Sequence, residues 1–541
     1  MSKPTELSSQ ILLEVDGVEV PRAVLIQLVE VEVDQHAYLP AMATVRLDDP
    51  ELRLLDNGPF NLACLLRINA ELANGKRVLL FEGEITALEP AFGSGMNAEL
   101  TVRAFDRLHR LYRKPNSVGH QNVKDSDIAK AVAAAAGLRA EVEETATVYE
   151  HLAQYNEPDL CFLQRRAARI GYECFVSERV LYFRKPGSDA SLPALIWGRD
   201  LTEFAPRMTL AQQVDEVLVK GWDHAKKSAI VGRAAAGKRY AQIGEAANGA
   251  AWARQFGPGS NIIVDEPVVS QAEADVLAAA KLDAISAGFV AGTGEAYRRP
   301  DLQPGRAVEL EALGERLSGR YWLGAVRHRY APSGLTAQFS VCSAHLGMLE
   351  TLSHTGGSPV LAKNPVIAIV TNTDDPKACG QVRVKYPWLS EQVESGWIRV
   401  IGAGAGRGCG LFALPAVGDE VLVVFLHGDA NFPVVLGGLW NGEDALPEEA
   451  AAAQQGRRSA VRTWRSRGGH RITCDDDANT LTLTTAGGHI ICMDDSHDVV
   501  AIQSQGKLKL HAGDIEVASQ GNIKLTADKR VEISGETIHL N

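Results

Sequence analysis

The sequence has few aromatic residues, few methionines and no excess of positive charge. Aromatic residues make up 6% of the 541 residues, methionines number 6, and the formal net charge is -12. Proteins that bind nucleic acids concentrate Lys and Arg, because phosphate contacts dominate their affinity. The acidic balance excludes a phosphate-dominated binder, so no nucleic-acid partner is expected. Hydrophobic residues at 45% and charged residues at 23% indicate globular domains.

Long apolar runs and paired cysteines are also lacking. Even the longest apolar runs, such as Val421–Leu426, are short, whereas a membrane-spanning helix needs about 20 apolar residues. Met1–Gly17 has no basic segment followed by an apolar stretch, which favours a first strand over a signal peptide. We therefore expect a protein made in the cytoplasm that leaves only through another machine. None of the 8 cysteines forms a C-x-x-C pair, which favours buried thiols over a metal site.

Composition and hydrophobic periodicity divide the chain into several domains, as its length predicts. Residues 1–350 are expected to be α+β, with helices inserted into a mainly β frame. Residues 351–365 are typical of a linker, and residues 366–442 alternate in the manner of a small β-barrel. Residues 443–463, which are acidic and rich in alanine at first, are expected to be a second linker. Residues 464–541 carry an internal repeat.

Capping signals place three helices in the first domain. Asp125-Ser-Asp127 can cap a helix over 128–136, and Pro158 fits the first turn of the next helix. Ser270 and Glu273 form a capping box ahead of an alanine-rich helix that runs to Ala287. Strand periodicity is clearest at Val29–Val33, where valines alternate with acidic residues.

The repeat has a very short period. Gly468-Gly-His-Arg-Ile-Thr-Cys-Asp475 recurs as Gly487-Gly-His-Ile-Ile-Cys-Met-Asp494, and Gln505-Gly-Lys-Leu-Lys-Leu510 recurs as Gln520-Gly-Asn-Ile-Lys-Leu525. Burying one apolar side chain stabilises a fold by about 1.5–3 kcal/mol, whereas ordering each backbone residue costs about 1–2 kcal/mol. A lone strand with two apolar residues is therefore unstable, and steps of seven or eight residues are too short for a single-chain solenoid.

Three copies of the chain winding together would solve this problem, because the apolar pairs would meet on a shared axis. The sequence therefore predicts an intertwined trimeric β-prism, a triple-stranded β-helix, with a two-sheet meander as the alternative. The residues predicted to form its core are Ile472, Leu481, Leu483, Ile490, Ile502, Leu508, Leu510, Ile515, Val517, Ile523, Leu525, Val531 and Ile533.

Several longer motifs support a family resemblance. In the first domain they are Tyr155-Asn-Glu-Pro-Asp-Leu-Cys-Phe-Leu-Gln-Arg-Arg166 and Gly319-Arg-Tyr-Trp-Leu-Gly-Ala-Val-Arg-His-Arg-Tyr330. In the small barrel they are Pro415-Ala-Val-Gly-Asp-Glu-Val421 and Phe432-Pro-Val-Val-Leu-Gly-Gly-Leu-Trp-Asn-Gly442. On these motifs the chain resembles the central spike of contractile injection systems: the VgrG proteins of type VI secretion, phage late-control protein D and tail hub–spike proteins, and extracellular injection particles.

The resemblance implies β-barrel hub domains, an OB-fold module and a trimeric needle. It also implies a homotrimer that caps the inner tube, adapts its six-fold symmetry to a three-fold needle and punctures a target envelope. The implied partners are the inner tube protein, baseplate components, a PAAR-type tip protein, effector cargo and, transiently, the target membrane. Ile538 and Leu540 are the candidate seat of the tip protein, although they can equally complete the core.

No catalytic, cofactor-binding or metal-binding residues are assigned, and no enzyme activity or cofactor is expected. Only a short segment separates the barrel from the repeat, which leaves no room there for a lysozyme domain. Gly232–Lys238 spells most of a phosphate-binding loop, but Arg239 follows in place of Ser or Thr. His470 and His489 occupy equivalent repeat positions and either bind an axial ion or point outward. The alternative functions are an envelope-degrading tail enzyme and a cargo adapter on a β-solenoid.

Overall fold

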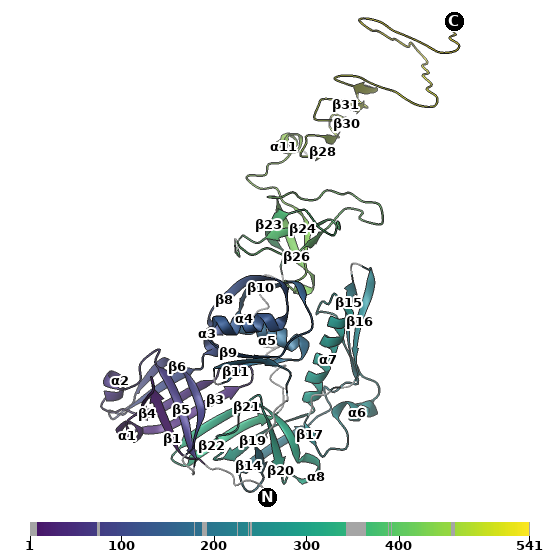
Figure 1. Cartoon of the computed structure of the whole chain (residues 1–541). Helices are drawn as coiled ribbons and strands as arrows, with labels where there is room; N and C mark the ends of the chain where they lie inside the picture. Colours follow the sequence, from purple (N-terminus) through teal and green to yellow (C-terminus); the bar gives the residue numbers. More distant parts are fainter. Residues whose placement is uncertain are drawn as a thin grey trace. The chain divides into compact units, whose positions relative to one another are not determined.

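The computed structural model of the chain describes residues 8–72, 76–177, 179–186, 192–223, 226–235, 237, 241–341, 364–387, 389–390, 392–455 and 460–539. These residues form two compact units, over 1–439 and 440–541 (Figure 1). The fold is mainly β, as the sequence predicted. The proposed linker at 351–365 lies almost entirely outside the described residues. No helix among the described residues is long and apolar enough to cross a membrane.

The first unit is built on one continuous sheet of fourteen strands. The pairing of β21 with β3 joins the strands of the two expected hub barrels. Three helices of four or five residues lie in its connections: α1 (Arg22–Leu25), α2 (Arg53–Asn57) and α8 (Gly314–Leu317). The strands are β1 (Ser8–Val15), β2 (Val18–Glu19), β3 (Leu28–His36), β4 (Met42–Asp48), β5 (Leu65–Leu72), β6 (Arg77–Phe92), β7 (Ala98–Phe105), β13 (Ala194–Ile196), β14 (Leu201–Met208), β17 (Gln242–Ile243), β19 (Val290–Tyr297), β20 (Ala307–Glu311), β21 (Gly319–Ala331) and β22 (Gly334–Val341).

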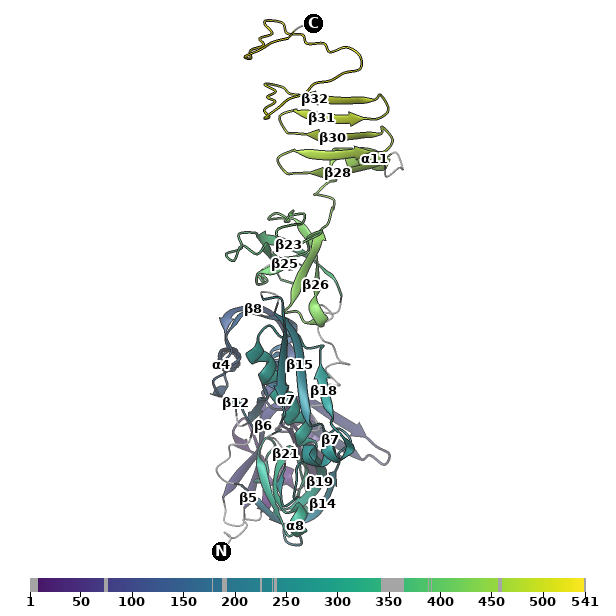
Figure 2. The ribbon, with the colours of Figure 1, turned by 90° about the vertical axis from the view of Figure 1, so that its right-hand side faces the viewer.

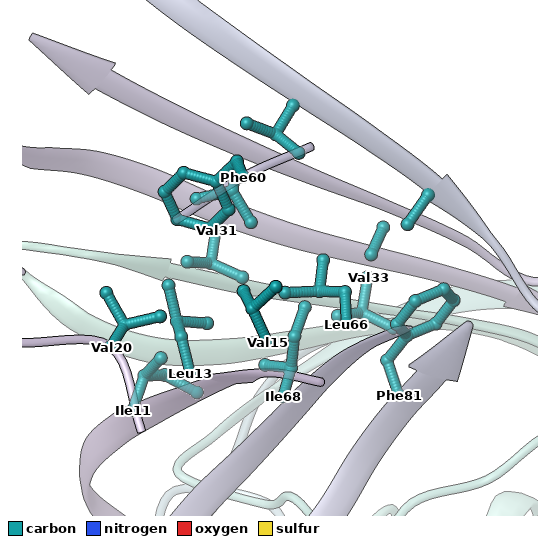
Figure 3. Packing of buried hydrophobic residues seen from close by; sticks show 14 of the residues in the cluster. Ile11, Leu13, Val15, Val20, Val31, Val33, Phe60, Leu66, Ile68 and Phe81 are labelled. Carbon is teal, nitrogen blue, oxygen red and sulfur yellow. The ribbon is translucent and has the colours of Figure 1, made fainter. Parts of the chain in front are cut away.

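Alternation along β3 positions the first core. Val31 and Val33 are 2% and 1% exposed, and Val31 lies opposite Val45 of β4, which is also buried. Figure 3 shows Val31 and Val33 packed with Phe60 and Leu66 from other segments of the same half. The predicted strand is therefore confirmed. A second apolar cluster, which includes Tyr321 and Phe339, fills the other half of the sheet.

A helical subdomain follows the first seven strands. Its helices are α3 (Leu108–Arg113), α4 (Asp125–Ala135) and α5 (Asp159–Ile170), and its strands are β8 (Pro115–Val123), β9 (Arg139–Val142), β10 (Tyr149–Pro158), β11 (Glu173–Ser177) and β12 (Val180–Arg184). Two predicted helix starts are corrected. Helix α4 begins at Asp125, and Asp127 sits in its first turn, where its carboxylate accepts the Lys124 N–H at 3.2 Å. Pro158 is the N-cap residue of α5 and ends β10, because its φ of -60° also fits an extended chain.

A buried ion pair ties α4 to α5. The Arg166 guanidinium donates to both carboxylate oxygens of Asp125, at 2.6 and 3.1 Å. Their side chains are only 4% and 1% exposed, and the guanidinium lies 4.5 Å from the centre of the Tyr149 ring. Two oppositely charged groups satisfy each other here in an apolar interior.

Helix α7 (Gln271–Ala287) forms where the capping signal predicted a helix, and it covers a small sheet. The Ser270 hydroxyl accepts the Glu273 N–H at 3.2 Å, and Gly288 follows the helix. The sheet contains β15 (Glu216–Asp223), β16 (Ser228–Ala234) and β18 (Ser260–Ile263), and short helices α6 (Gly249–Ala253) and η1 (Arg254–Phe256) precede β18 (Figure 1). A Cβ at Gly232 would lie 2.2 Å from the Ala274 backbone of α7. This glycine of the phosphate-loop-like motif is thus explained by packing.

The small barrel is closed by five strands: β23 (Val366–Asn372), β24 (Gln381–Lys385), β25 (Ile398–Val400), β26 (Glu420–Phe425) and β27 (Pro433–Gly438). A 3-10 turn, η2 (Leu426–Gly428), connects β26 to β27. Val382, Val384 and Tyr386 fill its core, as their alternation predicted. The Tyr386 ring meets Tyr155 of the helical subdomain edge-on, with ring centres 5.4 Å apart. Cysteines were expected to be mostly buried, but only Cys174 of the described cysteines is buried, and Cys379 and Cys409 in this module are exposed because both lie in loops between strands.

The second unit contains α11 (Glu448–Gln455) and a five-stranded sheet. The sheet strands are β28 (Val461–Arg465), β29 (Arg471–Asp475), β30 (Thr480–Thr484), β31 (Ile490–Asp494) and β32 (Val499–Gln503). The segment expected to be a linker thus includes a helix. Alanine and glutamate favour helix, and Glu449 pairs with Arg471 of the sheet.

Candidate functional site

The five-stranded sheet carries the apolar surface that the repeat predicted. Its strands follow one another as an antiparallel meander, in which each strand pairs with the next (Figure 2). Ile472 lies opposite Leu483, Leu483 opposite Ile491, and Ile491 opposite Ile502. Directly opposed residues project on the same face of a sheet, so these side chains form one apolar row. They are 39–57% exposed, which leaves the row uncovered by the described part of this chain.

Pairing within one chain corrects one expectation. Three copies winding together would give each strand of the needle a neighbour from another copy, whereas β28 to β32 pair with each other. The reason is turn length. Four or five residues separate consecutive strands, and Gly469, Asn479, Gly488 and Asp498 adopt the positive φ that such hairpin turns need.

The histidines of the repeat support these turns. His470 Nδ1 accepts the Ala486 N–H at 3.4 Å, and His489 Nδ1 accepts the Gln505 N–H at 3.2 Å. Each imidazole therefore links its own turn to the start of the next repeat. The sequence left two possibilities, an axial ion site and side chains that point outward. The hydrogen bonds favour a structural role over an ion site. The described residues contain no group of His, Cys, Asp and Glu side chains arranged to hold a metal ion.

The acidic turns are explained locally. The Asp475 carboxylate accepts the N–H groups of Asp477 and Ala478, at 3.0 and 2.9 Å. Asp494 accepts from the backbone and the ring of His497, and the hydrogen bond from the His497 ring is the main reason that the pKa of Asp494 lies below its usual range. These carboxylates shape turns.

One predicted core residue lies on the wrong face. Ile490 is opposite Thr484 and Gln503, on the face that carries threonines, whereas its neighbour Ile491 lies on the apolar face. The repeat itself holds the signal that was missed, because aligning Gly468 with Gly487 places Ile491 at the position of Ile472. The same face includes further apolar residues that the prediction omitted: Trp464, Cys474, Met493 and Val500.

Beyond the sheet, residues 504–539 continue the apolar pattern without forming strands. The predicted core residues of this segment are all more than half exposed: Leu508 55%, Leu510 68%, Ile515 56%, Val517 68%, Ile523 55%, Leu525 73%, Val531 54% and Ile533 62%. Ile538 is 49% exposed, and Leu540 lies outside the described residues. Leu481 and Leu483 lie with Ile472 on the apolar face of the sheet. The apolar surface thus runs through the repeat, and no described segment of the same chain covers it.

Comparisons with known proteins fit this arrangement. Residues 9–331 match a family model described as the Alg8 N-terminal domain, and residues 366–440 match the type VI secretion system/phage-baseplate injector OB domain. Spike protein VgrG1a of Pseudomonas aeruginosa is 40% identical over 86 residues, and VgrG3 of Vibrio cholerae is 30% identical over 123 residues. The chain belongs to the family described as the Alg8 N-terminal domain, and over the aligned segments it is similar to VgrG spike proteins.

The matches to these VgrG relatives are local. The VgrG1a alignment covers 15% of this chain and 13% of the relative, and the VgrG3 alignment covers 22% and 12%. The fold extends much further. A chain of the Francisella PdpA–VgrG complex in its lidded form superposes with a TM-score of 0.51 at 10% identity, covering 92% of this chain and 81% of that one. The fold of that chain therefore extends over most of this one.

Proposed function

We propose that this protein is the structural central spike of a contractile injection apparatus and acts as a homotrimer. One observation carries the proposal: the repeat presents a continuous apolar surface that the described part of its own chain leaves uncovered. A sheet with one apolar face must bury that face against another layer. Three copies, each presenting such a face to a common axis, would cover all of it.

The energetics favour assembly strongly in the segment after the sheet. Each short apolar pair there can contribute only about 3–6 kcal/mol even when it is fully buried. Ordering the five or so residues around it costs about 5–10 kcal/mol. The balance becomes favourable only when neighbouring copies supply backbone hydrogen bonds and complete the apolar layers. Folding of the needle and association of the chains are then one event.

Within the apparatus, the hub is proposed to cap the inner tube and to adapt its six-fold symmetry to the three-fold needle. Baseplate components would hold the hub, and the needle would contact the target membrane transiently as it punctures the envelope. Ile538 and Leu540 are the proposed seat of a PAAR-type tip protein. The protein would be made in the cytoplasm and delivered with the particle, with effector cargo as a further partner.

The division of the chain remains part of the proposal: hub domains over 1–350, an OB-fold module over 366–442 and a needle over 464–541, joined by segments 351–365 and 443–463. The spike is proposed to work without catalysis of its own, which agrees with relatives that are named as spike proteins. Clearing of peptidoglycan by the purified chain in a zymogram would instead support the envelope-degrading alternative.

The mass of the full chain in solution tests the proposal. Three copies of a 58.2 kDa chain should elute as one species of about 175 kDa by light scattering. Limited proteolysis of that species should leave the C-terminal repeat intact, because its backbone would be paired between copies. A stable 58.2 kDa monomer whose repeat resists proteolysis would overturn the proposal.

A further inference from the structure

The segment after the sheet carries charges of alternating sign between its apolar pairs. Lys509 lies between Leu508 and Leu510, and Glu516 lies between the next apolar pair. Lys524 and Glu532 repeat the alternation, and His539 follows. These five central positions are separated by 7, 8, 8 and 7 residues. Because side chains alternate between the two faces of a strand, each central residue projects away from the axis when its apolar neighbours project toward it.

The same positions in the preceding sheet are neutral. Thr463, Thr473, Thr482, Cys492 and Ala501 lie opposite one another in a single row across the five strands. The hydroxyl groups of Thr463 and Thr473 are 3.1 Å apart, within hydrogen-bonding distance. Here hairpin turns of one chain fix which strand lies beside which. Among the described residues, the charged central positions therefore begin where strand pairing within the chain ends, after β32.

The apolar pairs cannot fix the alignment of copies by themselves. Leu508 and Leu510, Ile523 and Leu525, and the other pairs have similar volumes and shapes. If one copy slipped along the axis by a single strand, the core would still be filled, and only the end of the needle would lose contacts. Sheet registers that are weakly specified by side chains are prone to such slips.

We propose that the alternating row Lys509, Glu516, Lys524 and Glu532 sets the axial register between copies of this chain. With the copies correctly staggered, Lys509 of one copy lies beside Glu516 of a second copy, and each later position again meets the opposite charge. A slip by one strand opposes Lys to Lys and Glu to Glu. Opposite charges across neighbouring strands stabilise a sheet and like charges destabilise it. This inference rests on the trimer proposed above.

The row acts by specificity more than by strength. Glu532 already contacts Arg530 two residues earlier, where both side chains are more than 60% exposed, so each ion pair is weak and salt-sensitive. The discrimination arises because every contact along the row changes sign together when the register slips. Specificity obtained by penalising the wrong partner is a common device at protein interfaces.

Charge reversal in the full chain tests this inference. Lys509→Glu with Lys524→Glu makes the central row entirely acidic, and adding Glu516→Lys with Glu532→Lys restores the alternation with inverted signs. The first variant should lower the temperature at which the trimer dissociates by about 5 °C or more at low salt. The fourfold variant should recover most of that loss. Lys507→Glu with Lys529→Glu changes the net charge equally outside the central row and is the matched control.

Mixing identifies the second copy as the partner. A chain with an acidic row and a chain with a basic row (Glu516→Lys, Glu532→Lys), carrying different tags, are co-expressed. We expect more mixed trimers than random assortment gives, and we expect them to be more stable than either homotrimer. Random assortment, or equal stability of the row variants and the control, would overturn the register inference while leaving a trimeric spike intact. A monomeric wild-type chain would overturn both.

Discussion

Replacing Leu508 by aspartate places a carboxylate in one apolar layer of the needle. Leu508 is 55% exposed in the single chain, so about half of its side-chain area would be left for burial in the proposed trimer. The lost apolar burial amounts to about 1 kcal/mol per chain. An ionised carboxylate without a partner in a low-dielectric layer costs several kcal/mol more. Three such groups at one level would destabilise the trimer by about 10 kcal/mol, because they also repel one another.

The measurement is the mass of the full chain by light scattering, combined with the protease resistance of the C-terminal repeat. Leu508→Asp should give monomers, or trimers whose repeat is rapidly cleaved, while the hub remains folded by circular dichroism. Lys507→Asp introduces the same carboxylate one residue earlier, on the opposite side of the strand, and should change little. A Leu508→Asp trimer as resistant as wild type would show that Leu508 does not face the axis.

Three further outcomes follow from the first unit. Asp125→Ala leaves Arg166 buried without its partner and should lower the free energy of unfolding by about 3–5 kcal/mol. Arg46→Ala removes a side chain that is 40% exposed and should lower it by less than about 1 kcal/mol. Calorimetric unfolding of the hub compares the two variants. Burial lowers the pKa of His328 to about 4, below its unfolded value of about 6.5. The free energy of unfolding should therefore fall by up to about 3 kcal/mol as the pH drops from 6.5 to about 4. A His328→Phe variant should lose this pH dependence in thermal melts. Ser270→Ala removes the cap of α7 and should speed amide exchange in its first turn about fivefold; unchanged exchange would contradict the capping role.

The elements that the sequence predicted well are those with strong local signals. Helix α7 carries a serine cap at Ser270 and a glycine stop at Gly288, and both lie where the pattern placed them. The alternation in β3 and in β24 also matched the buried faces. The start of α4 was misplaced because Asp125 and Asp127 both look like caps, whereas Lys124 is the N-cap residue and both aspartates lie in the first turn, where Asp125 pairs with Arg166.

The needle was harder to predict because pairing partners are not local. A short apolar pair such as Leu481 and Leu483 has the same pattern whether its neighbour strand belongs to the same chain or to another. The deciding information lies in the turns, where Asp475–Asn479 and Asp494–Asp498 are rich in residues that favour hairpins. Ile490 was misassigned for a related reason, since two consecutive isoleucines hide which of them continues the period of two.

The change in step length would explain why one repeat uses two kinds of strand pairing in the proposed trimer. Strands β28 to β32 begin 9 or 10 residues apart, which leaves 4 or 5 residues for each hairpin turn. After Ser504 the step shortens to 7 or 8 residues. A five-residue strand then leaves only two or three residues for a connection, and hairpins that tight require sequences such as Asn-Gly at the turn. Neither His511-Ala-Gly513 after Leu510 nor Thr526-Ala-Asp528 after Leu525 contains Asn-Gly, although the first ends in the glycine that a three-residue hairpin can use. The chain can make such short connections by advancing along the axis to a strand of another copy, and the charged central row begins at the same point.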